Sequence, residues 1–243
     1  MKLLLSIVAV FSLGQAVGQK WDSLEVFNGK GLDRPKLYIF SALGVNSTIT
    51  RAVDPTGFMV DGQSWSEASY KLGFEVVTPK HKYFYFQYEY RSMYFAPRFI
   101  NAPGIFFPNW RNMHGFGMSS SRGLFFRERE ILHVGYSVGA SVASPSYYTE
   151  GLTSIFRNNI NVPITMLNSI QRRIMPYVGL WFKRDFKLYH GFYISLQYGF
   201  NRGLYNVYRA DFMYNGSGEV ASLRSRGTHY EALIGVRLKA ADL

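Results

Sequence analysis

The five histidines are the side chains best able to act as bases near neutral pH, and what each can do depends on its neighbours. On a β-strand, a histidine and a serine two positions apart point the same way, and the base can reach the hydroxyl. The residues two positions after His81, His114, His133, His190 and His229 are Tyr83, Phe116, Gly135, Phe192 and Glu231. None is a serine, so no catalytic residue is expected and the chain is predicted to be non-enzymatic.

His229 and Glu231 share a face, but a nucleophile would have to come from another strand, and an ion-pair role is the stronger interpretation. The chain has no cysteine, which excludes disulfides, thiol catalysis and iron–sulfur clusters. The glycine-rich phosphate-binding, HExxH and EF-hand patterns are also missing. We therefore expect neither a metal nor a cofactor.

The elements that must position these residues are strands. In YKLGFEVVTPKHKYFYFQYEYR, residues 70–91, apolar or aromatic residues fill the even positions before Thr78 and again after Lys82. Charged residues such as Lys71, Glu75 and Glu89 stand between them. A period of two indicates β-strands with one apolar and one polar face.

The same alternation recurs along the chain and predicts an all-β protein. Eight strands are expected, at residues 36–46, 67–78, 82–95, 132–142, 159–167, 173–182, 191–200 and 228–238. A ninth candidate, residues 204–214, would extend a hairpin or raise the total to ten. In residues 132–142 the row opposite the apolar residues is glycine, serine and histidine, which suits a crowded barrel interior.

The N-terminus is typical of an export signal. Lys2 precedes the apolar run LLLSIVAVFSLG, and Ala16 and Gly18 fit a cleavage site before Gln19. The alternative is a buried N-terminal helix. The expected organisation is a signal peptide at 1–18, a lead at 19–35 and one barrel domain at 36–243.

Strands of about ten residues with alternating faces, in an exported chain, are typical of a closed antiparallel transmembrane β-barrel. The apolar row would face lipid. The polar row would fill the interior as a network of ion pairs, because eight strands leave room for little else. The residues expected in this lumenal network are Glu67, Lys71, Glu75, Glu89, Arg91, Glu231 and Arg237.

If both ends of the barrel domain lie in the periplasm, residues 47–66, 96–131 and 201–227 should be extracellular loops, and 79–82 and 183–190 periplasmic turns. Residues 144–158 are long for a periplasmic turn.

The segment 96–131 is basic and aromatic. It holds Arg98, Arg111 and Arg122 with Trp110, in a chain of net charge +11. Guanidinium groups match phosphate geometry, so one interpretation is a surface that contacts lipopolysaccharide. The other is a solvated loop whose aromatic residues pack on the barrel rim. Nucleic-acid binding is not expected of an exported chain that lacks any nucleic-acid fold signature.

The stretches KLYIFSALGVN (36–46), NINVPITML (159–167), MPYVGLWF (175–182) and QYGFNRGLYNV (197–207) resemble small outer-membrane β-barrels of the porin-family or PorT-like type. The architecture is similar to that of OmpX and the OmpA barrel. The resemblance implies an integral outer-membrane protein, assembled with the help of the barrel-assembly machinery. The chain ends in KAADL rather than the terminal aromatic residue of such barrels.

The expected function is structural, adhesive or partner-binding, through the extracellular loops, with outer-membrane lipid and lipopolysaccharide as surroundings. Two alternatives remain open. The PorT-like resemblance implies an accessory component of a protein-secretion or surface-assembly machine, with other surface or secretion proteins as partners. A soluble exported β-barrel carrying a small apolar ligand would show the same alternation, with its apolar row turned inward.

Overall fold

The computed structural model describes residues 34–63, 67–95, 97–100, 109–126, 129–144, 147–148, 153–157, 160–214 and 218–243. The expected signal peptide and all but the end of the lead lie outside these residues. Within the described ranges every regular element is a strand. In the part of the chain that the structure describes, no helix is long and apolar enough to cross a membrane.

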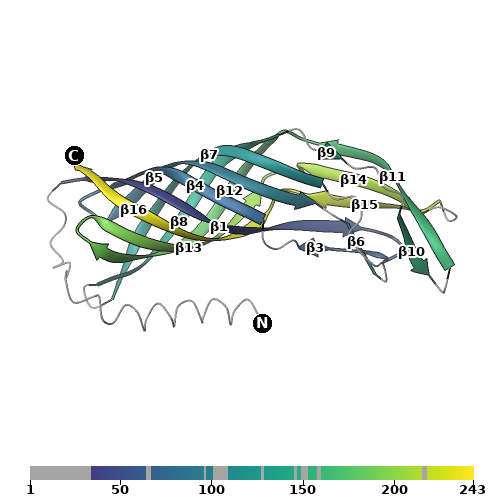
Figure 1. The fold of residues 1–243 in the computed structure, drawn as a ribbon, viewed down its shortest axis with the longest axis horizontal. Helices are drawn as coiled ribbons and strands as arrows, with labels where there is room; N and C mark the ends of the chain where they lie inside the picture. Colours follow the sequence, from purple (N-terminus) through teal and green to yellow (C-terminus); the bar gives the residue numbers. More distant parts are fainter. Residues whose placement is uncertain are drawn as a thin grey trace.

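Eight long strands close into an antiparallel barrel (Figure 1). Each barrel strand pairs with the next along the chain, and β1 pairs with both β4 and β16, which closes the ring. The barrel strands are β1 (Lys36–Val53), β4 (Glu67–Val77), β5 (Lys82–Phe95), β7 (Asn109–Phe126), β8 (Arg129–Ala143), β12 (Ile174–Tyr189), β13 (Phe192–Gly203) and β16 (His229–Asp242).

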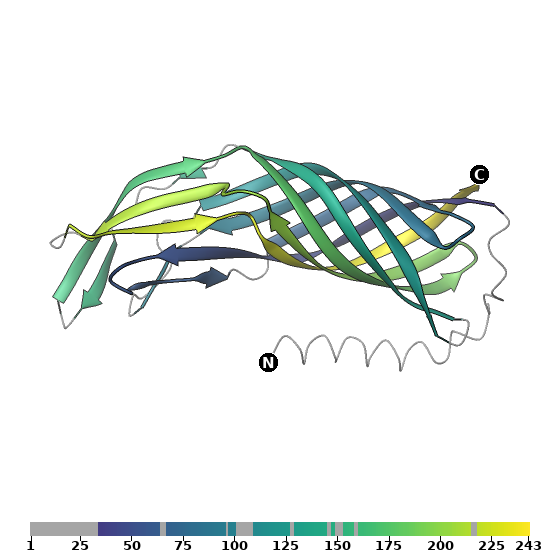
Figure 2. The ribbon, with the colours of Figure 1, turned by 180° about the vertical axis from the view of Figure 1, so that it is seen from behind.

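The two ends of the barrel differ. At one, here called the turn end, Lys36 pairs with Asp242 and the connections are tight. His81, with φ of 52°, and Gly191, with φ of 72°, sit in the β4–β5 and β12–β13 turns. The opposite end, here called the loop end, carries all four long connections, and the figures show it as an elongated extension of the barrel (Figure 2).

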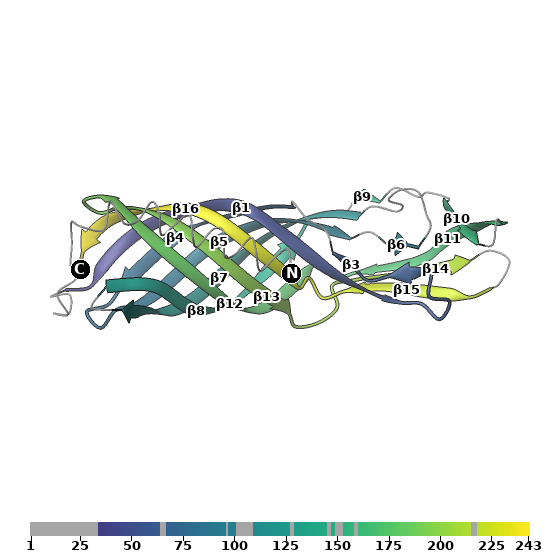
Figure 3. The same cartoon turned by 90° about the horizontal axis from the view of Figure 1, so that it is seen from below.

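The loop end is a second sheet rather than a set of loose loops. The distal part of β1 leaves the barrel and pairs with β15 on one side and β3 on the other, and the sheet continues through β14 and β11 to β10. Figure 3 shows these strands running on from the barrel wall. The remaining strands are β2 (Met59–Val60), β3 (Gly62–Gln63), β6 (Arg98–Phe99), β9 (Tyr147–Tyr148), β10 (Thr153–Arg157), β11 (Ile160–Gln171), β14 (Tyr208–Tyr214) and β15 (Val220–Ser225).

The loop-end sheet has an apolar core of its own. Phe212 and Tyr214 of β14 lie edge-on against Phe99 of β6, and Leu223 of β15 is fully buried. Met59 of β2 joins the same cluster, so the small β2–β6 ladder covers the inner face of the sheet. The region therefore packs as a small two-layered body on top of the barrel, here called the loop-end domain.

The all-β closed barrel of eight strands confirms the predicted fold class, but the membership of two strands was predicted wrongly. Residues 109–126, expected inside an extracellular loop, form β7 in the barrel wall. Residues 159–167, expected in the wall, lie largely in β11 of the loop-end domain. Residues 183–190 are not a turn, because β12 continues to Tyr189. The candidate strand 204–214 ends in β14, also outside the barrel.

The alternation within the wall places the apolar rows outside, as predicted. In β4 Phe74 is 54% exposed while its neighbour Glu75 is 0% exposed. Seven barrel strands carry exposed apolar residues on this outer face, and β13 adds the half-buried Ile194, Leu196, Tyr198 and Phe200. The exposed residues of this belt are Ile39, Leu43, Val45, Leu72, Phe74, Phe84, Phe86, Phe116, Met118, Leu124, Tyr136, Val138, Val142, Ile174, Val178, Leu180, Phe182, Leu188, Ile234, Val236 and Leu238.

The apolar belt predicts that a charged side chain placed on it will lower the stability of the barrel. We expect Phe74→Arg to destabilise the folded barrel in bilayers by about 2–4 kcal/mol, because the guanidinium group would enter hydrocarbon. Phe74→Leu keeps the outer face apolar and serves as the matched control. Urea unfolding in liposomes measures both, and equal stability of the two variants would contradict a lipid-facing position for residue 74.

Candidate functional site

The first cluster in the lumen surrounds the carboxylate of Glu75, near the turn end. Arg237 Nη1 donates to one Glu75 oxygen at 2.6 Å and Lys183 Nζ to the other at 3.1 Å. The same two cations contact Asp185 at 2.8 Å and 3.3 Å. Two anions thus share two cations, and His133 adds a contact to Asp185 at 3.4 Å. The cluster joins β4, β8, β12 and β16 across the interior.

A second cluster lies nearer the loop end. Lys71 forms an ion pair with Glu231 and lies 3.9 Å from Glu89, which in turn pairs with Arg91. Arg91 Nη2 also donates to Ser141 at 3.3 Å. Because every charge in this cluster has an opposite partner, its burial is tolerated.

Aromatic rings make cation–π contacts with cations of both clusters. The guanidinium carbon of Arg237 lies 4.4 Å from the ring centre of Tyr38 and 4.2 Å from that of Tyr193. Arg91 lies 4.5 Å from the ring centre of Tyr177, and Lys183 4.9 Å from that of Tyr85. The π faces supply attraction on the sides where carboxylates are absent, which offsets part of the lost hydration.

Small residues on β8 make room for these rings. A Cβ atom at Gly135 would come within 2.5 Å of the Trp181 indole, and one at Gly139 within 2.5 Å of the Tyr177 hydroxyl. The glycine and serine row predicted for a crowded interior therefore faces the two largest inward-pointing side chains of β12, Tyr177 and Trp181. The rings pack directly against the backbone of the neighbouring strand.

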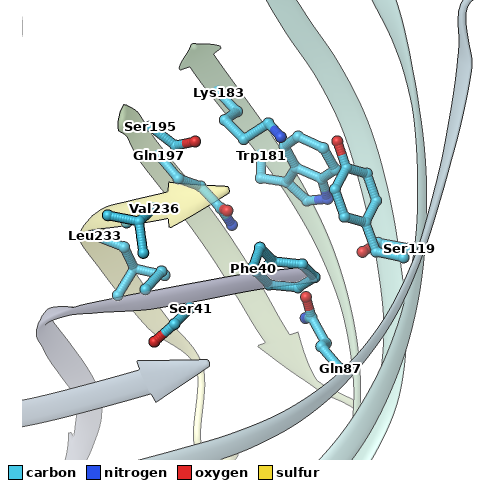
Figure 4. Close-up of a pocket in the computed structure, with 13 residues that line it drawn as sticks. Phe40, Ser41, Gln87, Ser119, Trp181, Lys183, Ser195, Gln197, Leu233 and Val236 are labelled. Carbon is cyan, nitrogen blue, oxygen red and sulfur yellow. The ribbon is translucent and has the colours of Figure 1, made fainter. Parts of the chain in front are cut away.

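A small pocket lies between the clusters. Gln87 of β5, Ser119 of β7, and Trp181 and Lys183 of β12 converge on this pocket (Figure 4). The volume open to the centres of water molecules is about 20 Å³. One water needs roughly 10–15 Å³ on this measure, so the pocket holds one or two waters and is no passage through the barrel.

Methionines close the lumen at the loop end. Met93, Met113 and Met175, from three barrel strands, are each at most 1% exposed. They pack in one apolar cluster with Tyr208 and Leu223 of the loop-end domain. The mouth of the barrel is therefore covered by a dry interface between its own wall and the domain above it.

The structure brings most of the predicted lumenal residues together. Lys71, Glu89, Arg91 and Glu231 meet in one cluster, and Glu75 and Arg237 in the other. The seventh, Glu67, lies apart near the loop end, where it accepts hydrogen bonds from Thr48 Oγ1 at 2.5 Å and from the Tyr94 backbone N–H at 2.8 Å.

Three residues of the lumenal ion-pair network were not predicted from the sequence: Lys183, Asp185 and His133. His133 was assigned the right face but given no partner. Lys183 and Asp185 were placed in a turn because the charged run 183–190 resembles one. Their parity was the available signal, since they continue the inward row of Gly179 and Trp181 in the same strand.

The structure does not gather the arginines predicted to contact lipopolysaccharide. Arg111 is 2% exposed in β7 and donates to the backbone carbonyl of Arg172 at 2.9 Å. Arg122 is exposed on the same strand but lies near the turn end, where it is in register with Lys82. Arg98 is exposed on β6 of the loop-end domain. Trp110 lies in β7, beside Arg111. The expectation of one basic loop surface across 96–131 was therefore wrong, because β7 separates its members.

The hydrogen bonds of His229 show how little freedom its imidazole has. Its Nδ1 lies 2.8 Å from the Gly227 carbonyl, and its Nε2 lies 2.9 Å from Arg91 Nη1. A carbonyl only accepts and a guanidinium only donates, so Nδ1 carries the proton and Nε2 accepts. The lone pair that a general base would need is therefore engaged by Arg91. Within the described residues, no group of three or more metal-binding side chains is placed to hold an ion.

A closed eight-stranded wall, an apolar outer belt and an ion-paired interior define a small transmembrane β-barrel. No protein-family model matches the sequence, and no curated protein matches it either. Among solved structures, the chain is similar to OprG from Pseudomonas aeruginosa, with 8% identity, a TM-score of 0.49, and coverage of 85% of this chain and 97% of that one. It is also similar to Neisserial surface protein A, with 11% identity, a TM-score of 0.41, and coverage of 84% and 97%. These likenesses concern the fold alone.

The Glu75 cluster predicts a large cost for removing its central carboxylate. Glu75→Ala should destabilise the barrel by about 3–5 kcal/mol, because Arg237 and Lys183 keep their charges in an interior shielded from bulk water. The double variant Glu75→Leu/Arg237→Met removes one charge of each sign and should recover much of the loss. Urea unfolding in liposomes is the measurement, and a double variant weaker than the single one would contradict the cluster.

The filled lumen predicts that the purified barrel does not conduct. Planar-bilayer recordings should show no stable, large conductance steps, because no water column fits between the clusters. The variant Glu75→Leu/Arg237→Met serves as a control for packing, since its side chains still fill the space. Stable conductance in the unmodified protein would show that the lumen opens.

Proposed function

We propose that the chain is a non-enzymatic integral protein of an outer membrane and that it acts through its loop-end domain, by contact with a partner at the cell surface. The observation that carries the proposal is the domain itself. Its sheet, β10-β11-β14-β15-β1, encloses a buried core of Ile164, Phe212, Ala221 and Leu223 above a lumen that is already filled. A chain needed only to span the membrane would not require this second body.

The outer-membrane assignment rests on the wall. Closed barrels satisfy every backbone group without water, and the belt residues turn large apolar side chains outward on a body whose interior is ionic. The loop end faces the cell exterior in this proposal, because barrels of this type place short turns in the periplasm and long connections outside. Insertion in this orientation would involve barrel-assembly machinery as a partner.

Two other functions differ in what they require of the interior and of the loop-end domain. A soluble barrel that carries an apolar ligand would need an apolar interior, whereas Glu75, Glu89 and Arg91 lie inside and Phe74 and Phe116 outside. An accessory role in protein secretion or surface assembly remains compatible with the proposal, because the partner of the loop-end domain would then be another surface or secretion protein. Purification with large membrane complexes would favour that form.

Because the chain has no cysteine, single cysteines test the orientation cleanly. Pro55→Cys lies in an exposed turn of the loop-end domain and Lys80→Cys in an exposed turn at the turn end. We expect a membrane-impermeant maleimide to label position 55 on intact cells and position 80 only after the outer membrane is permeabilised.

The purified proteins in detergent provide the control, since both positions should then react. Labelling of position 80 but not 55 on intact cells would reverse the orientation. Recovery of the mature protein in a soluble fraction without detergent would overturn the membrane assignment itself.

A further inference from the structure

Three arginines lie side by side on the loop-end domain, one on each of three adjacent strands. Arg51 of β1 is in register with Arg224 of β15, and Arg224 with Arg209 of β14. Residues directly opposite in antiparallel strands share a face, with Cβ atoms about 4.5–5.5 Å apart. The three guanidinium groups, here called the arginine row, thus stand together on the outer face of the sheet, because Leu223 and Ala210 fill the inner face.

The arginine row has little internal compensation. Arg209 Nε donates to Asp211 at 3.0 Å, and Ser222 donates to the same carboxylate oxygen at 2.5 Å. Burial acts to raise the pKa of Asp211, but these hydrogen bonds and the charges of Arg209 and Arg224 outweigh it and lower the pKa. Among the described residues, neither Arg51 nor Arg224 forms an ion pair, and the Arg224 Nε–H group is buried without an acceptor.

Like charges placed directly opposite in a sheet are destabilising. Asp61 lies near the sheet edge, but its carboxylate accepts the backbone N–H of Ala52 at 2.7 Å. Three cations therefore stand beside one paired carboxylate, Asp211, with Asp61 at the sheet edge, and an external anion would relieve the repulsion that remains. Guanidinium forks pair with phosphate oxygens in two-pronged hydrogen bonds, so a phosphate group is the matching ligand.

The position of the row favours an anion of the membrane. On β1 the odd-numbered residues Ile39, Leu43 and Val45 are exposed in the belt, Ser47 is buried, and Arg51 is exposed again at the same parity. Six residues separate Val45 from Arg51, or roughly 20 Å along the strand and less in height because barrel strands tilt. Exposed Val53 and Val220 flank the row. With the loop end outside the cell, this distance places the row beyond the hydrocarbon, at the level of the phosphorylated sugars of lipopolysaccharide.

We propose that Arg51, Arg224 and Arg209 form a binding site for the core phosphates of lipopolysaccharide and thereby seat the loop-end domain on the outer leaflet. The site replaces the basic loop expected from the sequence. It rests on the proposed orientation, in which the loop end faces the cell exterior.

The test uses the full mature chain, folded in detergent micelles, and purified lipopolysaccharide with a phosphorylated core. In Arg51→Gln/Arg224→Gln the Arg209–Asp211 pair stays intact, and affinity should fall at least about tenfold, the loss expected for charge-assisted contacts. The matched control, Lys80→Gln/Arg122→Gln, removes two exposed charges at the turn end and should bind as the unmodified protein does. Enzymatically dephosphorylated lipopolysaccharide should bind both double variants and the unmodified protein equally weakly.

A thermal unfolding measurement without ligand separates binding from folding. Relief of repulsion should leave the Tm of Arg51→Gln/Arg224→Gln unchanged or raise it. Arg51→Lys/Arg224→Lys keeps the charges without the planar forks, so its affinity should lie between those of the unmodified protein and the glutamine variant.

Unchanged lipopolysaccharide affinity in the glutamine variant, or an equal loss in the turn-end control, would overturn the proposal. Heparin serves as a sulfated probe. If the glutamine variant lost heparin binding but kept its affinity for lipopolysaccharide, the row would be assigned to a sulfated glycan outside the cell instead. Because micelles impose no orientation, failure here is distinct from failure of the cysteine-labelling test, which addresses the proposed function.

Discussion

The buried carboxylate of Glu75 is the interaction on which the barrel most depends. It is 0% exposed and receives hydrogen bonds from Arg237 and Lys183, which also hold Asp185. A charge taken so far from water is stable only while all of its partners stay in place. The same requirement fixes the register of β4, β12 and β16, because a shift of one residue would turn these side chains into lipid. Interior electrostatics and the apolar belt are thus two results of one alternation.

The two ends of the lumen are closed by different kinds of interaction. Toward the turn end, ion pairs and aromatic rings fill the interior, with Arg237 between Tyr38 and Tyr193. Toward the loop end, Met93, Met113 and Met175 meet the apolar core of the loop-end domain. Methionine adapts to irregular gaps, which suits a junction where barrel strands meet a sheet of different curvature. The barrel and the domain above it therefore share one continuous interior.

How much of this was predictable depends on what period-two alternation reports. It identified the faces of β4, β5, β8 and β16 correctly, together with most of the ion-paired residues, because each has one crowded and one apolar face. The alternation does not show whether a strand belongs to the barrel wall or to the loop-end domain. Residues 159–167 alternate because Ile164 enters the core of the loop-end domain, and were therefore mistaken for a strand of the wall. β7 was missed because Gly115 and Gly117 are small where Ser141 and Tyr177 approach, and a glycine-rich run resembles a loop.

β1 belongs to both bodies, pairing with β16 in the wall and with β15 in the loop-end domain. Closing the ring joins the first and last strands of the wall, the most distant pair in the chain, and so carries the largest loop-closure entropy of any pairing in it. Only residues 226–228 separate β15 from β16. Once β15 has paired with β1, β16 therefore lies next to β1 at the loop end, where the pairing that closes the barrel can begin. The surface domain would act as a template for sealing the barrel, linking its folding to that of the wall.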